Sequence, residues 1–139
     1  MSESITVEDQ RSITAFLDRI RQAWDAADAA AYGALFAQDA SYVIFMGDAQ
    51  FGREQITGIH HEVFTKWQKG TKMAVRPIDM RTIGADTAVV TTIGGIGKGS
   101  TIGYDKFQTY TLRRAVGGWE CVAFQNTEMS RRAKRAYSK

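Results

Sequence analysis

The chain has a single cysteine, Cys121, a single proline, Pro77, and only two histidines, which are adjacent at positions 60 and 61. One cysteine excludes an internal disulfide and is typical of a reducing compartment. Two successive side chains on a helix point about 100° apart, so the histidine pair is a poor metal-binding element. We therefore expect no disulfide, no metal and no cofactor.

Long apolar runs are also missing, because no stretch approaches the roughly 20 residues that a membrane span requires. The first ten residues are polar and acidic, unlike a signal peptide. At 139 residues, with 44% hydrophobic and 24% charged residues, the chain fits one soluble domain. We expect a cytoplasmic protein without membrane contact.

The charge is unevenly distributed along the chain. The net charge is +3, but residues 131–139 contain five basic residues and no acidic one, so the remainder carries −2. We expect one domain over residues 1–130 and a basic tail over 131–139. The tail is either a solvated, frayed end or a contact for phosphates or acidic partners. The acidic body argues against nucleic acid as a partner.

Helical periodicity dominates the first part of the chain. Residues 7–27 show apolar side chains at spacings of three and four, with Thr6 as the expected N-cap. Asp28 is expected to cap a second, shorter helix, whose buried face comprises Ala31, Tyr32, Leu35 and Phe36. Residues 53–68 return to helical spacing, and Gly70 ends this third helix.

Strand patterns occupy most of the remaining sequence. They predict strands at 41–46, 72–83, 87–96, 103–114 and 119–128, with at most a short one at 50–52. Pro77 indicates a bulge or an edge position. Gly94–Gly99 is expected to be a mobile connection, because no helix follows it to bind phosphate.

This order of elements predicts an α+β fold, in which N-terminal helices pack on a strongly curved antiparallel sheet and enclose a pocket. Three helices can cover only one face of such a sheet. The uncovered face favours a homodimer.

His60 and His61 differ in their expected surroundings. His60 shares an apolar stripe with Ile56, Val63 and Phe64, whereas His61 should face solvent. His60 is either a core histidine satisfied by hydrogen bonds or a polar group of the pocket that acts as donor, acceptor or base.

Amide side chains are concentrated in the last predicted hairpin. Gln108 and Tyr110 share one side of their strand, while Gln125 and Asn126 point to opposite sides of the next. Buried amides need partners, so either a structural network or a ligand satisfies them. Alternation alone leaves open which side faces the pocket. Among the acidic residues, Asp48 lies nearest to the expected pocket rim.

Three segments carry a family resemblance: Asp39–Val43, Gly52–Ile56 with His60 and Phe64 after it, and Gly118–Thr127. Together they resemble the SnoaL-like, nuclear-transport-factor-2-like superfamily and, within it, the SgcJ/EcaC group. The resemblance implies a cystatin-like cone, a homodimer packed through the sheet, and an association with polyketide biosynthesis.

The catalytic residues of the superfamily do not carry over to this chain. Ile44 stands where ketosteroid isomerases have their general base, Ile20 where they have a helix tyrosine, and Gln108 or Thr109 where they have an oxyanion-hole aspartate. The histidine–aspartate pair of SnoaL cyclases has no counterpart here. His60 and Asp48 remain as candidate catalytic residues.

Two functions follow as hypotheses. In the first, the chain acts on or accommodates a hydrophobic, aromatic or polyketide-type metabolite, with cofactor-free acid–base chemistry as the candidate reaction. In the second, it is a non-catalytic binding, resistance or dimeric scaffold protein. The expected ligand-binding residues are Trp24, Phe45, Phe51, Trp67, Gln108, Tyr110, Gln125 and Asn126.

Overall fold

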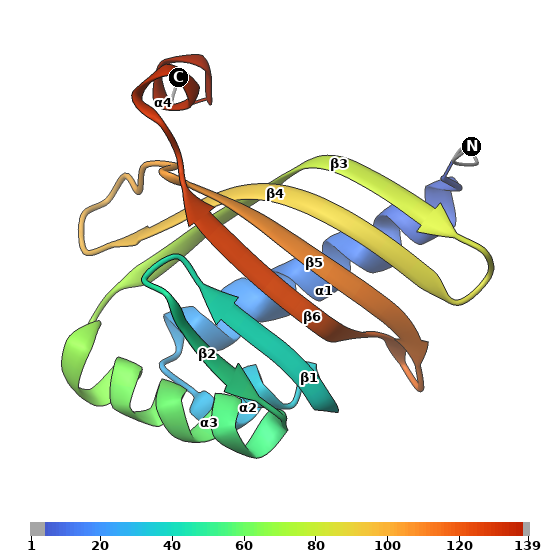
Figure 1. Cartoon of the computed structure of the whole chain (residues 1–139), viewed down its shortest axis with the longest axis horizontal. Coiled ribbons are helices and arrows are strands. Elements are labelled where there is room, and N and C mark those ends of the chain that lie inside the picture. Colours follow the sequence, from blue (N-terminus) through green and yellow to red (C-terminus); the bar gives the residue numbers. More distant parts are fainter. Residues whose placement is uncertain (1–4, 138–139) are drawn as a thin grey trace.

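The computed structural model describes residues 5–137, in which helices pack against a curved six-stranded sheet (Figure 1). Helix α1 spans Val7–Asp25 and helix α2 spans Ala29–Gly33. The Thr6 hydroxyl accepts the N–H of Asp9, and the Asp28 carboxylate accepts the N–H of Ala31, each across 3.0 Å. Both predicted N-caps are therefore confirmed, and each satisfies a donor that the helix itself leaves unpaired.

The third helix changes its winding before it ends. Helix α3 spans Arg53–Glu62 and continues as a π-helical turn, η1, over Val63–Trp67. In this turn the N–H of Gln68 donates to the carbonyl of Val63 across 2.7 Å. The prediction of a uniform α-helix to residue 68 was wrong for this turn. Single π-helical turns are rare in proteins, and those that occur are often at functional sites.

The sheet contains one parallel pair of strands. Its strands are β1 (Phe36–Ile44), β2 (Asp48–Phe51), β3 (Lys72–Ile83), β4 (Thr87–Gly97), β5 (Lys106–Ala115) and β6 (Gly118–Glu128), in the order β2-β1-β6-β5-β4-β3. β1 and β6 run parallel, while the other neighbours are antiparallel. The predicted α+β fold with a curved sheet is confirmed, but the sheet is mixed and not antiparallel throughout, because the long connection between β1 and β6 permits a parallel pairing.

Two local predictions about strands differ in outcome. Pro77 lies on β3, an edge strand, and next to a shift in register between Pro77 and Asp79, so it is both at an edge and at a bulge. Gly94–Gly97, in contrast, belongs to β4 and pairs with β3. The predicted glycine loop therefore begins later, after Gly97.

The second helix ends earlier than its apolar pattern suggested. Phe36 is the first residue of β1, and the carbonyl of Leu35 accepts the N–H of Cys121 on β6 across 2.9 Å. Because β6 takes up this backbone, Leu35 and Phe36 do not form a helical face. Phe36 is nevertheless fully buried.

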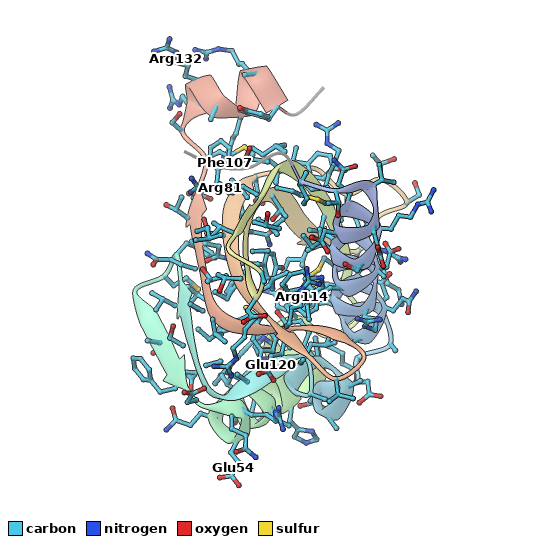
Figure 2. The ribbon with its side chains drawn as sticks, turned by 90° about the vertical axis from the view of Figure 1, so that its right-hand side faces the viewer. Glu54, Arg81, Phe107, Arg114, Glu120 and Arg132 are labelled. Carbon is cyan, nitrogen blue, oxygen red and sulfur yellow. The ribbon has the colours of Figure 1, made fainter. Side chains whose placement is uncertain are left out.

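The basic C-terminal segment is ordered over most of its length. Arg131–Tyr137 forms helix α4, and Lys139 lies outside the described residues. The ring of Tyr137 meets that of Phe107 edge to face, with centroids 5.3 Å apart. Figure 2 shows α4 above Phe107, with Arg132 directed away from the sheet. Residues 131–137 thus form a helix and not a frayed end, and this helix touches the body through Tyr137.

Helix α1 crosses behind the sheet in Figure 1 and buries its apolar stripe against it. Two polar contacts fix its position. The Trp119 indole N–H donates to the Ser12 hydroxyl across 2.8 Å, and the Arg114 guanidinium contacts the Asp9 carboxylate at 2.9 Å. The core lies between α1, α2, α3 and this inner face of the sheet.

Two glycines in the helices provide a matched stability test. A methyl group at Gly33 would collide with the Thr57 side chain, whereas one at Gly58 would meet no atom within 4 Å. We expect Gly33→Ala to lower the free energy of unfolding by about 1–3 kcal/mol through overpacking. Gly58→Ala should raise it by about 0.5–1 kcal/mol, because alanine favours the helix.

Urea denaturation monitored by circular dichroism measures both values. Equal effects of the two substitutions would contradict the close packing of α2 against α3.

Candidate functional site

A cavity of about 850 Å³ opens at the end of the sheet where β1, β4 and β6 finish and β3 and β5 begin. Helices α1, α2 and α3, the turn η1 and strand β2 complete its wall. Its lining is Trp24, Tyr32, Tyr42, Ile44, Phe45, Met46, Asp48, Gln50, Ile59, His60, Val63, Trp67, Gln68, Met73, Gly95, Ile96, Asp105, Lys106, Gln108, Phe124 and Asn126.

The structure brings most of the sequence-predicted site residues to this cavity. Both candidate catalytic residues and five candidate ligand-binding residues line it: Trp24, Phe45, Asp48, His60, Trp67, Gln108 and Asn126. They come from seven different elements or turns, so the fold and not local sequence assembles them.

Three predicted ligand-binding residues lie elsewhere. Phe51, at the end of β2, is 63% exposed and does not line the cavity. Tyr110 is fully buried deeper in the core, where its ring contacts those of Phe16 and Phe124. Gln125 is exposed on the outer face of the sheet, where it pairs with Thr109.

The register of the last hairpin explains the positions of Tyr110 and Gln125. Gln108 is directly opposite Asn126, and Tyr110 is opposite Phe124, so all four side chains share the inner face. Gln125 alternates to the other side. Tyr110 then lies two residues further from the cavity mouth than Gln108, and its hydroxyl is buried without a hydrogen-bond partner among residues 5–137.

Aromatic rings form the helical side of the cavity. The ring of Trp24 meets those of Phe64 and Tyr32 edge to face, with centroids 5.0 and 5.8 Å apart. Its indole N–H donates to the Thr71 hydroxyl across 3.0 Å, which leaves only the apolar ring to face the cavity. Tyr42 stacks on Phe124 with centroids 4.6 Å apart.

His60 is buried and both of its ring nitrogens have protein partners. Nδ1 lies 2.7 Å from the Ile56 carbonyl, and Nε2 lies 3.1 Å from the Tyr42 hydroxyl, which in turn lies 2.7 Å from the Tyr32 hydroxyl. Burial lowers the pKa of His60 from 6.5 to about 4, against the smaller opposite effect of the hydrogen bond to Ile56. The imidazole is therefore neutral near pH 7.

The direction of each hydrogen bond in this chain follows from elementary chemistry. A carbonyl only accepts, so Nδ1 of His60 carries the proton and Nε2 must accept from Tyr42. Tyr42 has then used its proton and accepts from Tyr32. The chain ends at the Tyr32 oxygen, which retains a lone pair, and Tyr32 is one of the residues that line the cavity. The outcome for His60 combines the two alternatives, since it is a satisfied core histidine whose ring also lines the cavity.

The amide side chains of the sheet, in contrast to the tyrosine–histidine chain, keep hydrogen-bond donors available. The Asn126 Oδ1 accepts the backbone N–H of Phe45 across 2.8 Å, and the Gln108 Oε1 accepts the Thr92 hydroxyl across 2.6 Å. Each amide oxygen is thus engaged within the protein. The two NH₂ groups are the remaining donors of these cavity-lining side chains.

A glycine makes room for one of these amides. A Cβ at Gly94 would lie 2.5 Å from the Gln108 Oε1 and 2.9 Å from its Nε2. The glycine run that the sequence suggested was a loop therefore contains a residue that lets Gln108 lie flat against β4.

Sequence reasoning missed an ion pair at the cavity wall. The Lys106 ammonium lies 2.9 Å from the Asp105 carboxylate and 4.4 Å from the centre of the Phe45 ring. The Lys106 side chain is only 14% exposed. The signal available in the sequence was the alternation of Lys106, Gln108 and Tyr110 on one face of β5.

Asp48 lines the rim but is exposed, and its carboxylate accepts the N–H of Ala49 across 2.9 Å. Over the described residues, no three His, Cys, Asp or Glu side chains come together in a group that could hold a metal ion. No helix between residues 5 and 137 is long and apolar enough to cross a membrane.

These features define an α+β cone with a partly aromatic cavity at its open end. A family model described as "SnoaL-like domain" matches residues 13–126. The chain belongs to the SnoaL-like domain family. No curated protein sequence matches it.

Solved structures show the same fold. A domain of unknown function with a cystatin-like fold from Nostoc punctiforme is 20% identical, with a TM-score of 0.81 over 95% of this chain and 84% of that one. An NTF2-like protein with a cystatin-like fold from Novosphingobium aromaticivorans is 24% identical, with a TM-score of 0.73 over 94% and 88% of the two chains. A ketosteroid isomerase-like protein from Erwinia carotovora atroseptica is 18% identical, with a TM-score of 0.68 over 90% and 99%.

The lowered pKa of His60 predicts how stability varies with pH. The unfolded chain binds a proton at this residue near pH 6.5, but the folded chain does so only near pH 4. The contribution of neutral His60 to the free energy of unfolding is therefore complete above pH 6.5. It falls by up to about 3 kcal/mol as the pH is lowered from 6.5 to 4.

His60→Gln should show a weaker fall in unfolding free energy between pH 6.5 and 4 than wild type, and His61→Gln should match wild type because His61 is exposed. Urea titrations at several pH values measure this. A fall of the same size in all three proteins would contradict the buried, neutral state of His60.

Proposed function

We propose that this protein binds a hydrophobic, aromatic small molecule in its open cavity. The observation that carries the proposal is a cavity of about 850 Å³ whose lining is largely aromatic and aliphatic. Small-molecule sites typically have about 300–1,000 Å³ and a few polar groups among apolar ones. Phe45, Met46, Trp67 and Ile96 are exposed to solvent and all line this cavity, so a ligand would cover them.

A polyketide-type aromatic metabolite fits this description. The resemblance to the SgcJ/EcaC group supports this finer assignment, and a ketosteroid isomerase-like protein shares the fold. The fold alone does not transfer an activity. The chemistry of the cavity lining is therefore the main support.

The site favours binding over acid–base catalysis. A general base needs a free lone pair near the substrate, but Nε2 of His60 already accepts the Tyr42 hydroxyl. Asp48 lies exposed at the rim, where its carboxylate binds a neighbouring N–H. We propose that the protein accommodates its ligand without transforming it. Cofactor-free enzyme activity is the alternative.

Filling the cavity tests the proposed function. Val63 lines the cavity from the π-helical turn, whereas Ile83 lies at the far end of β3 and is 56% exposed. We expect Val63→Trp to weaken binding of the neutral fluorescent probe N-phenyl-1-naphthylamine by at least about tenfold, because the indole occupies ligand space. Ile83→Trp adds the same group away from the cavity and should leave binding unchanged.

Fluorescence titration measures both affinities, and thermal melts confirm folding. Equal affinity of the two tryptophan variants would place the probe outside the cavity and contradict the proposal.

We also propose that two copies associate through the outer face of the sheet. A shallow hollow there is lined by uncharged residues of the outer face: Ser41, Val43, Phe107, Thr109, Thr111, Ala123, Gln125 and Thr127. No helix covers this part of the sheet within residues 5–137, apart from the contact of α4 at Phe107. An uncovered, uncharged sheet face is suited to a two-fold contact.

Sedimentation tests the dimer. Wild type should sediment at micromolar concentration as a species of twice 15.4 kDa. Thr111→Asp places a charge in the hollow and should shift the protein towards the monomer, whereas Ile83→Asp, outside the hollow, should not. A wild-type protein that sediments only at 15.4 kDa would refute the proposal.

A further inference from the structure

Three hydrogen-bond donors lie together on the sheet side of the cavity. Lys106 and Gln108 alternate on the inner face of β5, and Gln108 is directly opposite Asn126 on β6. We call Lys106, Gln108 and Asn126 the donor wall. Directly opposed side chains in an antiparallel pair have Cβ atoms about 4.5–5.5 Å apart, so one ligand atom can reach both amides.

The protein itself orients these donors. A backbone N–H can only donate, so the contact with Phe45 requires that the oxygen of Asn126 turns towards the backbone and its NH₂ group away from it. The Thr92 hydroxyl donates to the oxygen of Gln108, and Gly94 leaves space for this amide. Preorganised donors of this kind recognise an oxygen acceptor without first breaking bonds of their own.

The positive charge of Lys106 in the donor wall is balanced by the carboxylate of Asp105. The Lys106 ammonium pairs with Asp105 at 2.9 Å and can direct its other protons elsewhere. The second oxygen of Asp105 is buried without a hydrogen-bond partner in the described part of the chain. A carboxylate ligand beside Lys106 would be repelled by Asp105, whereas a neutral carbonyl oxygen would be polarised by the ammonium and the amides.

The polar groups on the helical side of the cavity bond to one another. The chain from Tyr32 through Tyr42 to His60 ends at the Tyr32 oxygen, and Tyr32 is only 1% exposed. The donor wall is therefore the part of the lining that retains N–H groups for an oxygen of the ligand.

We propose that the donor wall binds the carbonyl oxygen of a neutral aromatic ketone or quinone. This assignment rests on the proposed function, because it specifies the ligand class of the same cavity.

Three naphthalenes of the same size test the assignment by isothermal titration calorimetry. 6-Hydroxy-2-acetonaphthone carries the ketone, 6-ethyl-2-naphthol lacks its carbonyl oxygen, and 6-hydroxy-2-naphthoic acid replaces it with a carboxylate. Wild type should bind the ketone about tenfold more tightly than either analogue. The ethyl analogue leaves the N–H donors of the site without an acceptor, and the carboxylate is repelled by Asp105.

Isosteric variants test whether the side-chain NH₂ groups donate to the carbonyl oxygen. Asn126→Asp and Gln108→Glu keep the acceptor oxygen for Phe45 and Thr92 but remove the NH₂ donor. Both should abolish the preference for the ketone over the ethyl analogue. Gln38→Glu makes the same chemical change on an exposed residue of β1, outside both the cavity and the outer hollow, and should retain the preference. If Gln108→Glu does not fold, Asn126→Asp alone decides.

Each remaining outcome is informative. If wild type binds none of the three naphthalenes, the proposed function itself fails. If it binds all three equally, the cavity takes aromatic ligands but the donor wall does not read a carbonyl. If the carboxylate binds most tightly, or if Gln38→Glu loses the preference as well, the assignment is overturned.

Discussion

The parallel pairing of β1 with β6 is the constraint on which the cavity depends. It sets Tyr42 beside Phe124, whose rings stack, and it brings the N–H of Phe45 to the amide oxygen of Asn126. The aromatic lining and the orientation of a key donor therefore share one register. A shift by one residue would move Asn126 to the outer face and Gln125 to the inner one.

The polar groups of the cavity follow a simple division. On the helical side, a chain of neutral groups from Tyr32 to His60 is satisfied internally and ends in an acceptor. On the sheet, the amide oxygens are satisfied internally and the NH₂ groups remain. Burial, which holds the pKa of His60 at about 4, keeps the helical side uncharged near neutral pH. A site of this kind recognises oriented dipoles more readily than it transfers protons.

Sequence patterns predicted the elements better than their assembly. Periodicity and capping located α1 and α2 through Thr6 and Asp28, and strand patterns located β3 to β6, because these signals are local. The β1–β6 pairing joins residues about eighty positions apart and leaves no local trace. The inner face of β6 was ambiguous, since Val122, Ala123 and Phe124 are apolar on both sides. Lys106 and Asp105 resembled ordinary surface charges until the fold placed them at the cavity.

The central claim is that the free NH₂ groups of Gln108 and Asn126 face a bound ligand. Nuclear magnetic resonance of nitrogen-15-labelled protein observes these side-chain amides directly during titration with 6-hydroxy-2-acetonaphthone. The account predicts that the NH₂ signals of Gln108 and Asn126 move together and saturate, while that of Gln125 stays in place. Movement of the Gln125 signal, with those of Gln108 and Asn126 unchanged, would contradict it.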